Sequence, residues 1–174
     1  MKPPPITRRL FKLAKEFITA DIFREVQLAT AVDDTRNPRR KEKIRAAGIT
    51  IDGAGNFLCA LGLLCYTDFA ARLKQKASKK RGNGETAFKA FFKTLGPEYE
   101  AFQEHHNVYD WVRGGMVHNY YMKKSFGVSM RGPQSCGVSV QDDGRYLFVV
   151  ERYAVDLLAA LDELEGELFP PSVP

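Results

Sequence analysis

Apolar residues recur at steps of three and four along the first part of the chain, which is the spacing of one face of an α-helix. The first such stretch begins after Thr7, a residue type that often caps helix N-termini, and runs to about Val32. Residues 33–38 end it, because they include Pro38 and the residue before a proline resists the α conformation. A short basic helix is expected over 39–47. The stripe of the first helix comprises Leu10, Ala14, Phe17, Ile18, Ile22, Val26 and Ala29.

The most apolar stretch of the chain covers residues 57–66, where almost every position is hydrophobic. A helix that is apolar on all sides is normally buried on all sides, so we expect this helix in the middle of a bundle. The same helix becomes basic towards residues 72–80, where we expect it to emerge into water.

The second half of the chain combines helical spacing with short β-rich runs. We expect a short helix over 86–95, a long helix from Glu98 to about Tyr120, and a final helix over 154–168. Strand-like runs lie near residues 126–130, 138–140 and 146–150, and Asp143-Gly144 between the last two predicts a hairpin. The predicted fold is mainly α, a helical bundle with a small antiparallel β-hairpin or flap inserted before the C-terminal helix, in a single domain over residues 1–174.

Composition places the chain among globular proteins of a reducing compartment. Hydrophobic residues make up 44% of its 174 positions and charged residues 27%. No apolar run reaches the roughly 18 residues of a membrane span, and the first residues lack the apolar region of a secretory signal. The three cysteines, Cys59, Cys65 and Cys136, are too few and too unevenly placed for a disulfide framework, and no Cys-x-x-Cys pair suggests zinc. We therefore expect a cytoplasmic protein without a membrane segment or cofactor.

The net charge of +5 hides an uneven distribution along the chain. Residues 1–93 hold 20 Lys and Arg against 9 Asp and Glu, whereas residues 94–174 hold 6 against 12. Basic patches attract polyanions such as nucleic acids, although a solvated, basic helix end would give the same composition. If nucleic acid binds, we expect it at two clusters, which comprise Arg39, Arg40, Lys41 and Lys43, and then Arg72, Lys74, Lys76, Lys79, Lys80 and Arg81.

The stretch 109–120 carries the clearest candidate chemistry. It holds two adjacent glycines inside a helical pattern, at a cost of about 1 kcal/mol each relative to alanine. Arg113 and His118 flank these glycines. A guanidinium grips a phosphate with a planar fork, and an imidazole carries protons near neutral pH. Together they suit RNA cleavage without a metal, which needs proton transfer and positive charge at the phosphate.

Arg113 and His118 form an Arg-x-x-x-x-His pattern that resembles the motif of the HEPN superfamily. The resemblance implies a small helical bundle, phosphate binding by Arg113, proton transfer by His118, and metal-independent endoribonuclease activity. It also implies a homodimer in which two motifs face one cleft. The residue after the arginine, polar in many catalytic members, is Gly114 here.

Five residues turn an ideal α-helix through about 140°, so Arg113 and His118 do not share a narrow face. Either a symmetric dimer or a distortion at the glycines would bring them together. Tyr120 is the further residue expected to contact RNA, by stacking on a base. His106 and Asp110 face the same way on a continuous helix, but two ligands are too few for a metal site.

The alternative function is a non-catalytic module for dimerisation or for a protein partner, in which Arg113 and His118 are structural. On that hypothesis Arg113 pairs with an acid such as Asp110, and His118 is a buried, hydrogen-bonded histidine. The identity of any cognate partner does not follow from the sequence.

Overall fold

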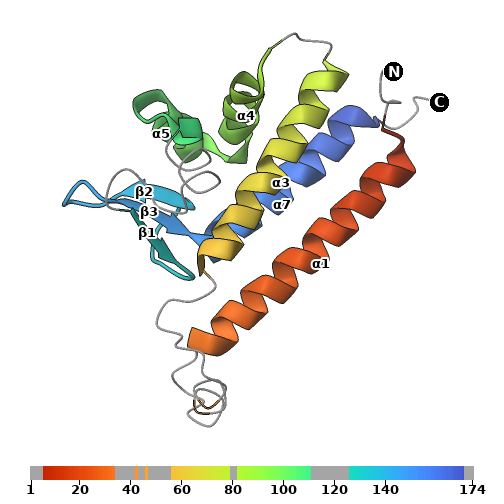
Figure 1. The fold of residues 1–174 in the computed structure, drawn as a ribbon. Helices are drawn as coiled ribbons and strands as arrows, with labels where there is room; N and C mark the ends of the chain where they lie inside the picture. Colours follow the sequence, from red (N-terminus) through yellow and green to blue (C-terminus); the bar gives the residue numbers. More distant parts are fainter. Residues whose placement is uncertain are drawn as a thin grey trace.

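The helices form three layers in a computed structural model that describes residues 6–33, 42, 46, 56–78, 82–110 and 126–170. Helix α1 (Arg8–Asp33) lies on one side, and α3 (Asn56–Ala77) and α7 (Val150–Leu168) form the middle layer (Figure 1). On the far side lie α4 (Gly84–Phe92), a 3₁₀ turn (Lys93–Leu95), α5 (Pro97–His105) and a small sheet. The predicted class, mainly helical with a small sheet before the C-terminal helix, is confirmed.

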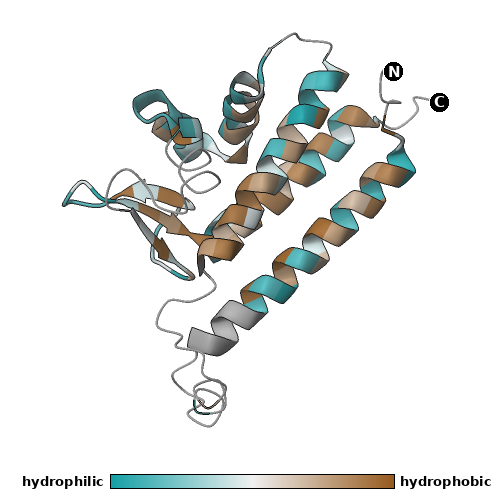
Figure 2. Ribbon diagram, viewed as in Figure 1, coloured by the Kyte–Doolittle hydropathy of each residue, from teal (hydrophilic) through white to brown (hydrophobic). Residues whose placement is uncertain are grey.

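Helix α1 begins where the sequence predicts, but its buried face is rotated from the predicted stripe. The Leu10 N–H donates to Thr7 Oγ1 at 3.3 Å, so Thr7 caps the helix as expected. The buried side chains are Phe11, Ile18 and Ile22, whereas Leu10 and Phe17 are exposed. The prediction that Leu10 and Phe17 belong to the buried stripe is therefore wrong, and α1 has apolar residues on two sides (Figure 2). Of the predicted basic helix over 39–47, only the helical and exposed Glu42 and Ala46 lie among the described residues.

Helix α3 packs against α1, α4 and α7, yet one of its faces stays open to solvent. Its buried apolar residues are Cys59, Ala60, Leu63, Leu64, Ala70 and Ala71. Leu58, Cys65 and Phe69 are exposed, so the expectation that the helix is buried on all sides is wrong for this face. Cys59 is buried and Cys65 is exposed, and all three cysteines are free thiols.

An aromatic core joins α4, the 3₁₀ turn and α5 to the middle layer. Phe88, Phe91 and Phe92 are fully buried, and the Phe92 ring packs edge-on against Tyr99 at 5.2 Å between centroids. Asn83 caps α4 by accepting the Thr86 N–H at 2.9 Å, so this helix starts two residues before the predicted Thr86.

The predicted long helix from Glu98 to Tyr120 is interrupted. Helix α5 ends at His105, and His106 has extended backbone angles, φ −138° and ψ 131°. A new helical turn starts at Val108, and residues 111–120 of the predicted helix lie outside the described residues. Polar side chains stabilise the break: Gln103 Nε2 donates to the His106 carbonyl at 3.2 Å, and Asn107 Nδ2 donates to Asp110.

The sheet contains β1 (Phe126–Ser129), β2 (Val138–Val140) and β3 (Tyr146–Val149) in the order β1-β3-β2. Strands β2 and β3 form the antiparallel hairpin predicted from Asp143-Gly144, and Gly144 has the positive φ, 77°, that the turn requires. Strand β1 instead pairs with β3 in parallel, so the expectation of a wholly antiparallel flap is wrong for β1. The segment after β1 crosses over to the far edge of β3, and the Val149 N–H secures it by donating to the Gly137 carbonyl at 2.9 Å. Helix α7 follows β3 directly, four residues before the predicted start at Ala154.

Acidic residues near the end of α7 neutralise basic residues of the two neighbouring helices. Lys15 of α1 donates to Glu165 at 2.8 Å and pairs with Asp162 as well. Lys74 of α3 contacts Glu167 at 2.8 Å. The hydrogen bond from Lys15 lowers the pKa of the Glu165 carboxyl below its ordinary value. Part of the positive charge of the first half of the chain is therefore neutralised by ion pairs between α1 or α3 and the acidic end of α7.

Among the described residues, none of the helices combines the length and the apolar character needed to cross a membrane.

Candidate functional site

Most of the predicted site lies outside the described residues. This holds for Arg113 and His118, the proposed catalytic pair, and for Tyr120. It also holds for the predicted nucleic-acid contacts Arg39, Arg40, Lys41, Lys43, Lys79, Lys80 and Arg81. The structure does describe the elements that precede and follow the motif segment in the chain.

The three described residues of the predicted basic surface lie on the last turns of α3. Arg72 Nε donates to Asp68 Oδ2 at 3.1 Å, one turn earlier on the same helix. Lys74 is held by Glu167, while Lys76 is exposed to solvent. Exposed ion pairs are weak, so a phosphate could displace these partners, but part of the charge counted in the sequence is already balanced.

The residues just before the motif are anchored to α4. Val108 is buried, and the Tyr109 ring packs edge-on against Phe88 with 5.6 Å between centroids. A Cβ placed on Gly84 would lie 3.4 Å from Arg72 Nη2 and 3.6 Å from the Tyr109 hydroxyl. The Arg72 guanidinium and the Tyr109 hydroxyl therefore approach one point at the start of α4, and Tyr109 precedes Arg113 by four residues. Both groups hydrogen-bond phosphate oxygens readily.

The backbone of Tyr109 and Asp110 is π-helical. A π-helix forms hydrogen bonds between residues five apart, and such turns often occur at functional sites. Five residues also separate Arg113 from His118. A distortion at the glycines is one of the two arrangements that would bring Arg113 and His118 together, the other being a symmetric dimer, and Tyr109 and Asp110 are distorted a few residues before Arg113.

His106 and Tyr146 form a second polar group at the end of α5. His106 Nδ1 and the Tyr146 hydroxyl lie 2.9 Å apart, and the Phe102 ring packs on the imidazole with 4.6 Å between centroids. Burial lowers the pKa of His106, and the nearby His105 lowers it further. Burial also raises the pKa of Tyr146. The hydroxyl and Nδ1 share one hydrogen bond, in which the tautomer of the imidazole decides which atom donates. Forty residues separate the partners, so no sequence pattern pointed to this pair.

We predict that the pKa of His106 in the folded protein lies below the ordinary histidine value of about 6.5. The free energy of unfolding should therefore decrease as the pH falls from about 6.5 towards that lower pKa. The folded state disfavours the protonated imidazole, so the unfolded chain binds the proton more tightly and gains population in acid. An NMR titration of the imidazole protons measures the pKa directly. His105→Gln should raise the pKa of His106 only in part, because burial, the larger cause, remains. A pKa at or above 6.5 in the native protein would contradict this account.

Two amide oxygens beside His106, Gln103 Oε1 and Asn107 Oδ1, are buried and accept no hydrogen bond from the described residues. Buried acceptors of this kind are uncommon, and a donor from elsewhere in the chain or from a ligand would stabilise them.

His106 and Asp110 do not share a helical face, since α5 ends before His106. Within the described ranges no three His, Cys, Asp or Glu side chains gather as metal ligands would.

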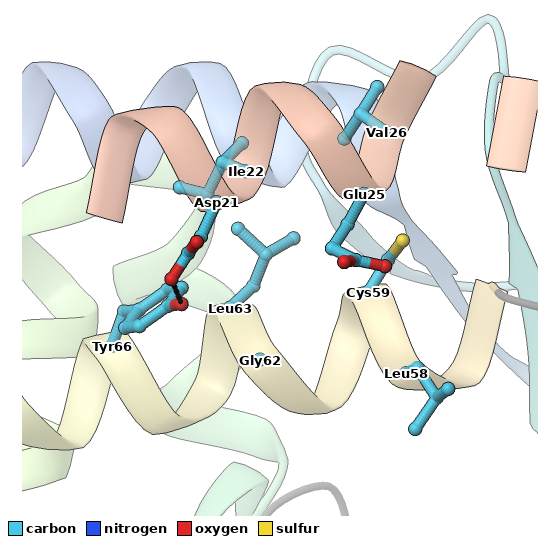
Figure 3. A pocket seen from close by; sticks show the side chains of 9 residues that line it. All are labelled: Asp21, Ile22, Glu25, Val26, Leu58, Cys59, Gly62, Leu63 and Tyr66. Carbon is cyan, nitrogen blue, oxygen red and sulfur yellow. Dashed lines mark hydrogen bonds between the residues drawn. The ribbon is translucent and has the colours of Figure 1, made fainter. Parts of the chain in front are cut away.

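A separate hollow lies between α1 and α3, with Ile22, Leu63 and Leu58 among its apolar lining (Figure 3). Tyr66 donates to Asp21 Oδ2 at 2.9 Å across it. Burial, with a smaller effect of Glu25, raises the pKa of the Cys59 thiol to about 11. A thiol that stays protonated is a poor nucleophile, so this hollow offers packing rather than chemistry.

Comparisons with protein-family models, with curated proteins and with solved structures found no match.

Proposed function

We propose that this chain is an RNA-directed protein of HEPN type, a metal-independent endoribonuclease in which Arg113 binds the phosphate and His118 transfers the proton. The observation that carries the proposal is the Arg-x-x-x-x-His pattern around Gly114-Gly115. The mainly helical architecture supports it, because the pattern resembles a motif found on helical bundles.

Two structural features support a site in which Arg113 and His118 of the same chain act together. Tyr109 and Asp110 are π-helical, and the same spacing, if it held over residues 113–118, would bring Arg113 and His118 towards one face. Arg72 and the Tyr109 hydroxyl approach the same point on α4, beside the chain that leads into the motif. We propose Arg72 and Lys76, together with the basic residues of 39–43 and 79–81, as the remaining contacts.

The test is cleavage of a structured RNA in EDTA, where metal-dependent nucleases are inactive. We expect His118→Ala to reduce the cleavage rate by about 10²- to 10⁴-fold, the usual contribution of a proton-transfer group. Arg113→Lys should also slow cleavage, because lysine keeps the charge but loses the planar fork. His105→Ala serves as the matched control, since it removes an exposed histidine outside the motif and should leave the rate nearly unchanged.

RNA binding should weaken steeply as salt rises, because it releases counterions from the phosphates. A preparation that neither cleaves in EDTA nor binds RNA in a salt-dependent way would remove the proposal. Equal loss of cleavage in His118→Ala and His105→Ala would remove the assigned role of His118.

The second candidate is a non-catalytic module for association, and the exposed apolar side of α1 favours it. On this hypothesis Arg113 and His118 stabilise the fold. A thermal melt separates the two: a large loss of stability in His118→Ala supports a structural histidine, whereas an unchanged melt with lost cleavage supports catalysis.

A further inference from the structure

Helix α3 presents one narrow face to solvent along most of its length. Leu58, Cys65, Phe69, Arg72 and Lys76 are all exposed, with Leu58 at 60% and Phe69 at 36%. At 3.6 residues per turn these five positions fall within an arc of about 60°, so they form one row, which we call the open face. Figure 3 shows the Leu58 side chain at its start, pointing away from α1. The open face is apolar in its first half and basic in its second.

We propose that the open face binds single-stranded RNA, with the Phe69 ring stacked on an unpaired base and with Arg72 and Lys76 on the neighbouring phosphates. This inference rests on the proposed function, and it adds to the phosphate contacts already named a residue that contacts a base.

The second half of the open face suits a phosphate backbone. Arg72 Nε donates to Asp68 Oδ2 at 3.1 Å, which orients the guanidinium, and Nη2 extends towards the start of α4. A guanidinium held in this way is ready to grip a phosphate with its planar fork. Lys76 lies one turn further along α3, and the next charged residues in the sequence are the basic residues 79–81.

The first half of the open face has acidic neighbours. Asp21 and Glu25 of α1 line the hollow that Leu58 also borders. Carboxylates repel phosphates, so the field of the protein favours the RNA backbone at Arg72 and Lys76 and leaves the apolar half to the bases.

Phe69 lies where the apolar half of the open face meets the basic half. It precedes Arg72 by about 4.5 Å and Lys76 by about 10 Å along the axis, at 1.5 Å per residue, so both cations are near a base that lies on the ring. An exposed ring beside cations is typical of surfaces that bind single strands, and stacking tolerates any base. Bases inside a duplex offer only their edges, so the ring can stack only on an unpaired base.

A protein partner is the rival occupant of the open face. A specific protein interface buries at least roughly 1,000 Å² and has an apolar centre with a polar rim. The open face is one row of side chains wide, and half of that row is basic. The observations therefore favour a single RNA strand, which is narrow and anionic.

The test is equilibrium binding of the full chain to labelled RNA by fluorescence anisotropy. The probes carry 2′-O-methyl groups, so they cannot be cleaved through the 2′-hydroxyl. They are a single strand, a duplex of the same sequence, and an abasic strand of the same length. Phe69→Leu keeps an apolar side chain but removes the ring, and it should raise the Kd for the single strand by about fivefold to a hundredfold. Its Kd for the duplex and for the abasic strand should equal that of the wild type.

Two further variants control for the ring and its position. Phe69→Tyr keeps an aromatic ring and should bind the single strand as the wild type does. Phe17→Leu makes the same exchange at a 64% exposed position on α1 and should leave every Kd unchanged. Equal losses of Phe69→Leu on the single strand and on the abasic strand would overturn the stacking, because the abasic strand offers no base.

The salt dependence of binding tests the phosphate contact and separates this inference from the proposed function. Lys76→Gln, at an exposed position, should reduce the slope of log K against log salt by about 0.7, the value of one phosphate contact on a single strand, whereas Phe69→Leu should leave the slope unchanged. This measurement decides the phosphate contact even if circular dichroism shows that Phe69→Leu is unfolded.

Salt-dependent RNA binding that is equally tight in Phe69→Leu would overturn this inference alone and favour a protein partner on the open face. A wild type that binds none of the probes would remove the proposed function as well.

Discussion

Gly137→Ala is expected to lower the free energy of unfolding by about 3 kcal/mol, the upper part of the range for overpacked cores. A Cβ on Gly137 would lie 2.6 Å from Tyr153 Cα and 2.5 Å from the Tyr99 hydroxyl. The first atom is backbone in the middle of the protein and cannot rotate away. The Gly137 N–H also donates to the Tyr99 hydroxyl at 2.9 Å, and its carbonyl accepts from Val149 at 2.9 Å. Any shift that relieves the clash therefore weakens both hydrogen bonds.

Gly62→Ala is the matched control for this prediction. Nothing lies within 4 Å of a Cβ on Gly62, and the residue is inside α3. Alanine there should stabilise the helix by up to about 1 kcal/mol, because glycine is the poorer helix former. Urea denaturation of both variants measures the two changes in the free energy of unfolding, provided that the m-value stays the same as in the wild type. If Gly137→Ala unfolded within about 1 kcal/mol of the wild type, the close packing of Gly137 against α7 would be wrong.

Local chemistry let the sequence predict most of the helices and the hairpin. The capping of α1 by Thr7, and the turn at Asp143-Gly144, are decided within a few residues, and both are confirmed. The parallel pairing of β1 with β3 was not predicted, because it depends on where the crossover carries β2. The face of α1 that is buried was also mistaken, since Leu10 and Phe11 are equally apolar and only the position of the neighbouring helices selects between them.

In the candidate site, too, features set by neighbouring residues could be predicted, whereas contacts between residues far apart in the sequence could not. Arg113 and His118 were found because a short pattern in sequence carries them, and their geometry stays a prediction. The pair of His106 and Tyr146 was not foreseen, because the hairpin brings the tyrosine to the end of α5 from 40 residues away. Charge counts suggested a basic surface, but Lys74 is paired with Glu167 from the C-terminal helix. Composition records the charges and not their partners.

A buried polar network at the centre of the fold supports the second large prediction. Asp156 of α7 is 7% exposed and accepts the Tyr99 hydroxyl at 2.6 Å. Arg152, one turn earlier, grips the same carboxylate with two hydrogen bonds, at 3.0 and 2.7 Å. Tyr99 in turn accepts the Gly137 N–H, so one carboxylate orients α5, α7 and the segment before β2. Burial, and then the hydrogen bond to Asp156, raise the pKa of Tyr99, which remains a neutral donor.

Asp156→Ala is expected to lower the free energy of unfolding by about 3 kcal/mol, because the buried Tyr99 hydroxyl loses its acceptor and hydrogen bonds to a charged group are among the stronger ones. Asp156→Asn keeps an acceptor oxygen of the same size, so its loss should be about half as large. Glu163→Ala removes an exposed carboxylate from the same helix and should stay within about 0.5 kcal/mol of the wild type. Urea denaturation of the three variants tests the order. Similar losses for Asp156→Ala and Glu163→Ala would mean that the network does not hold α5 against α7, and that the aromatic contacts of Tyr99 with Phe92 and Tyr153 do so alone.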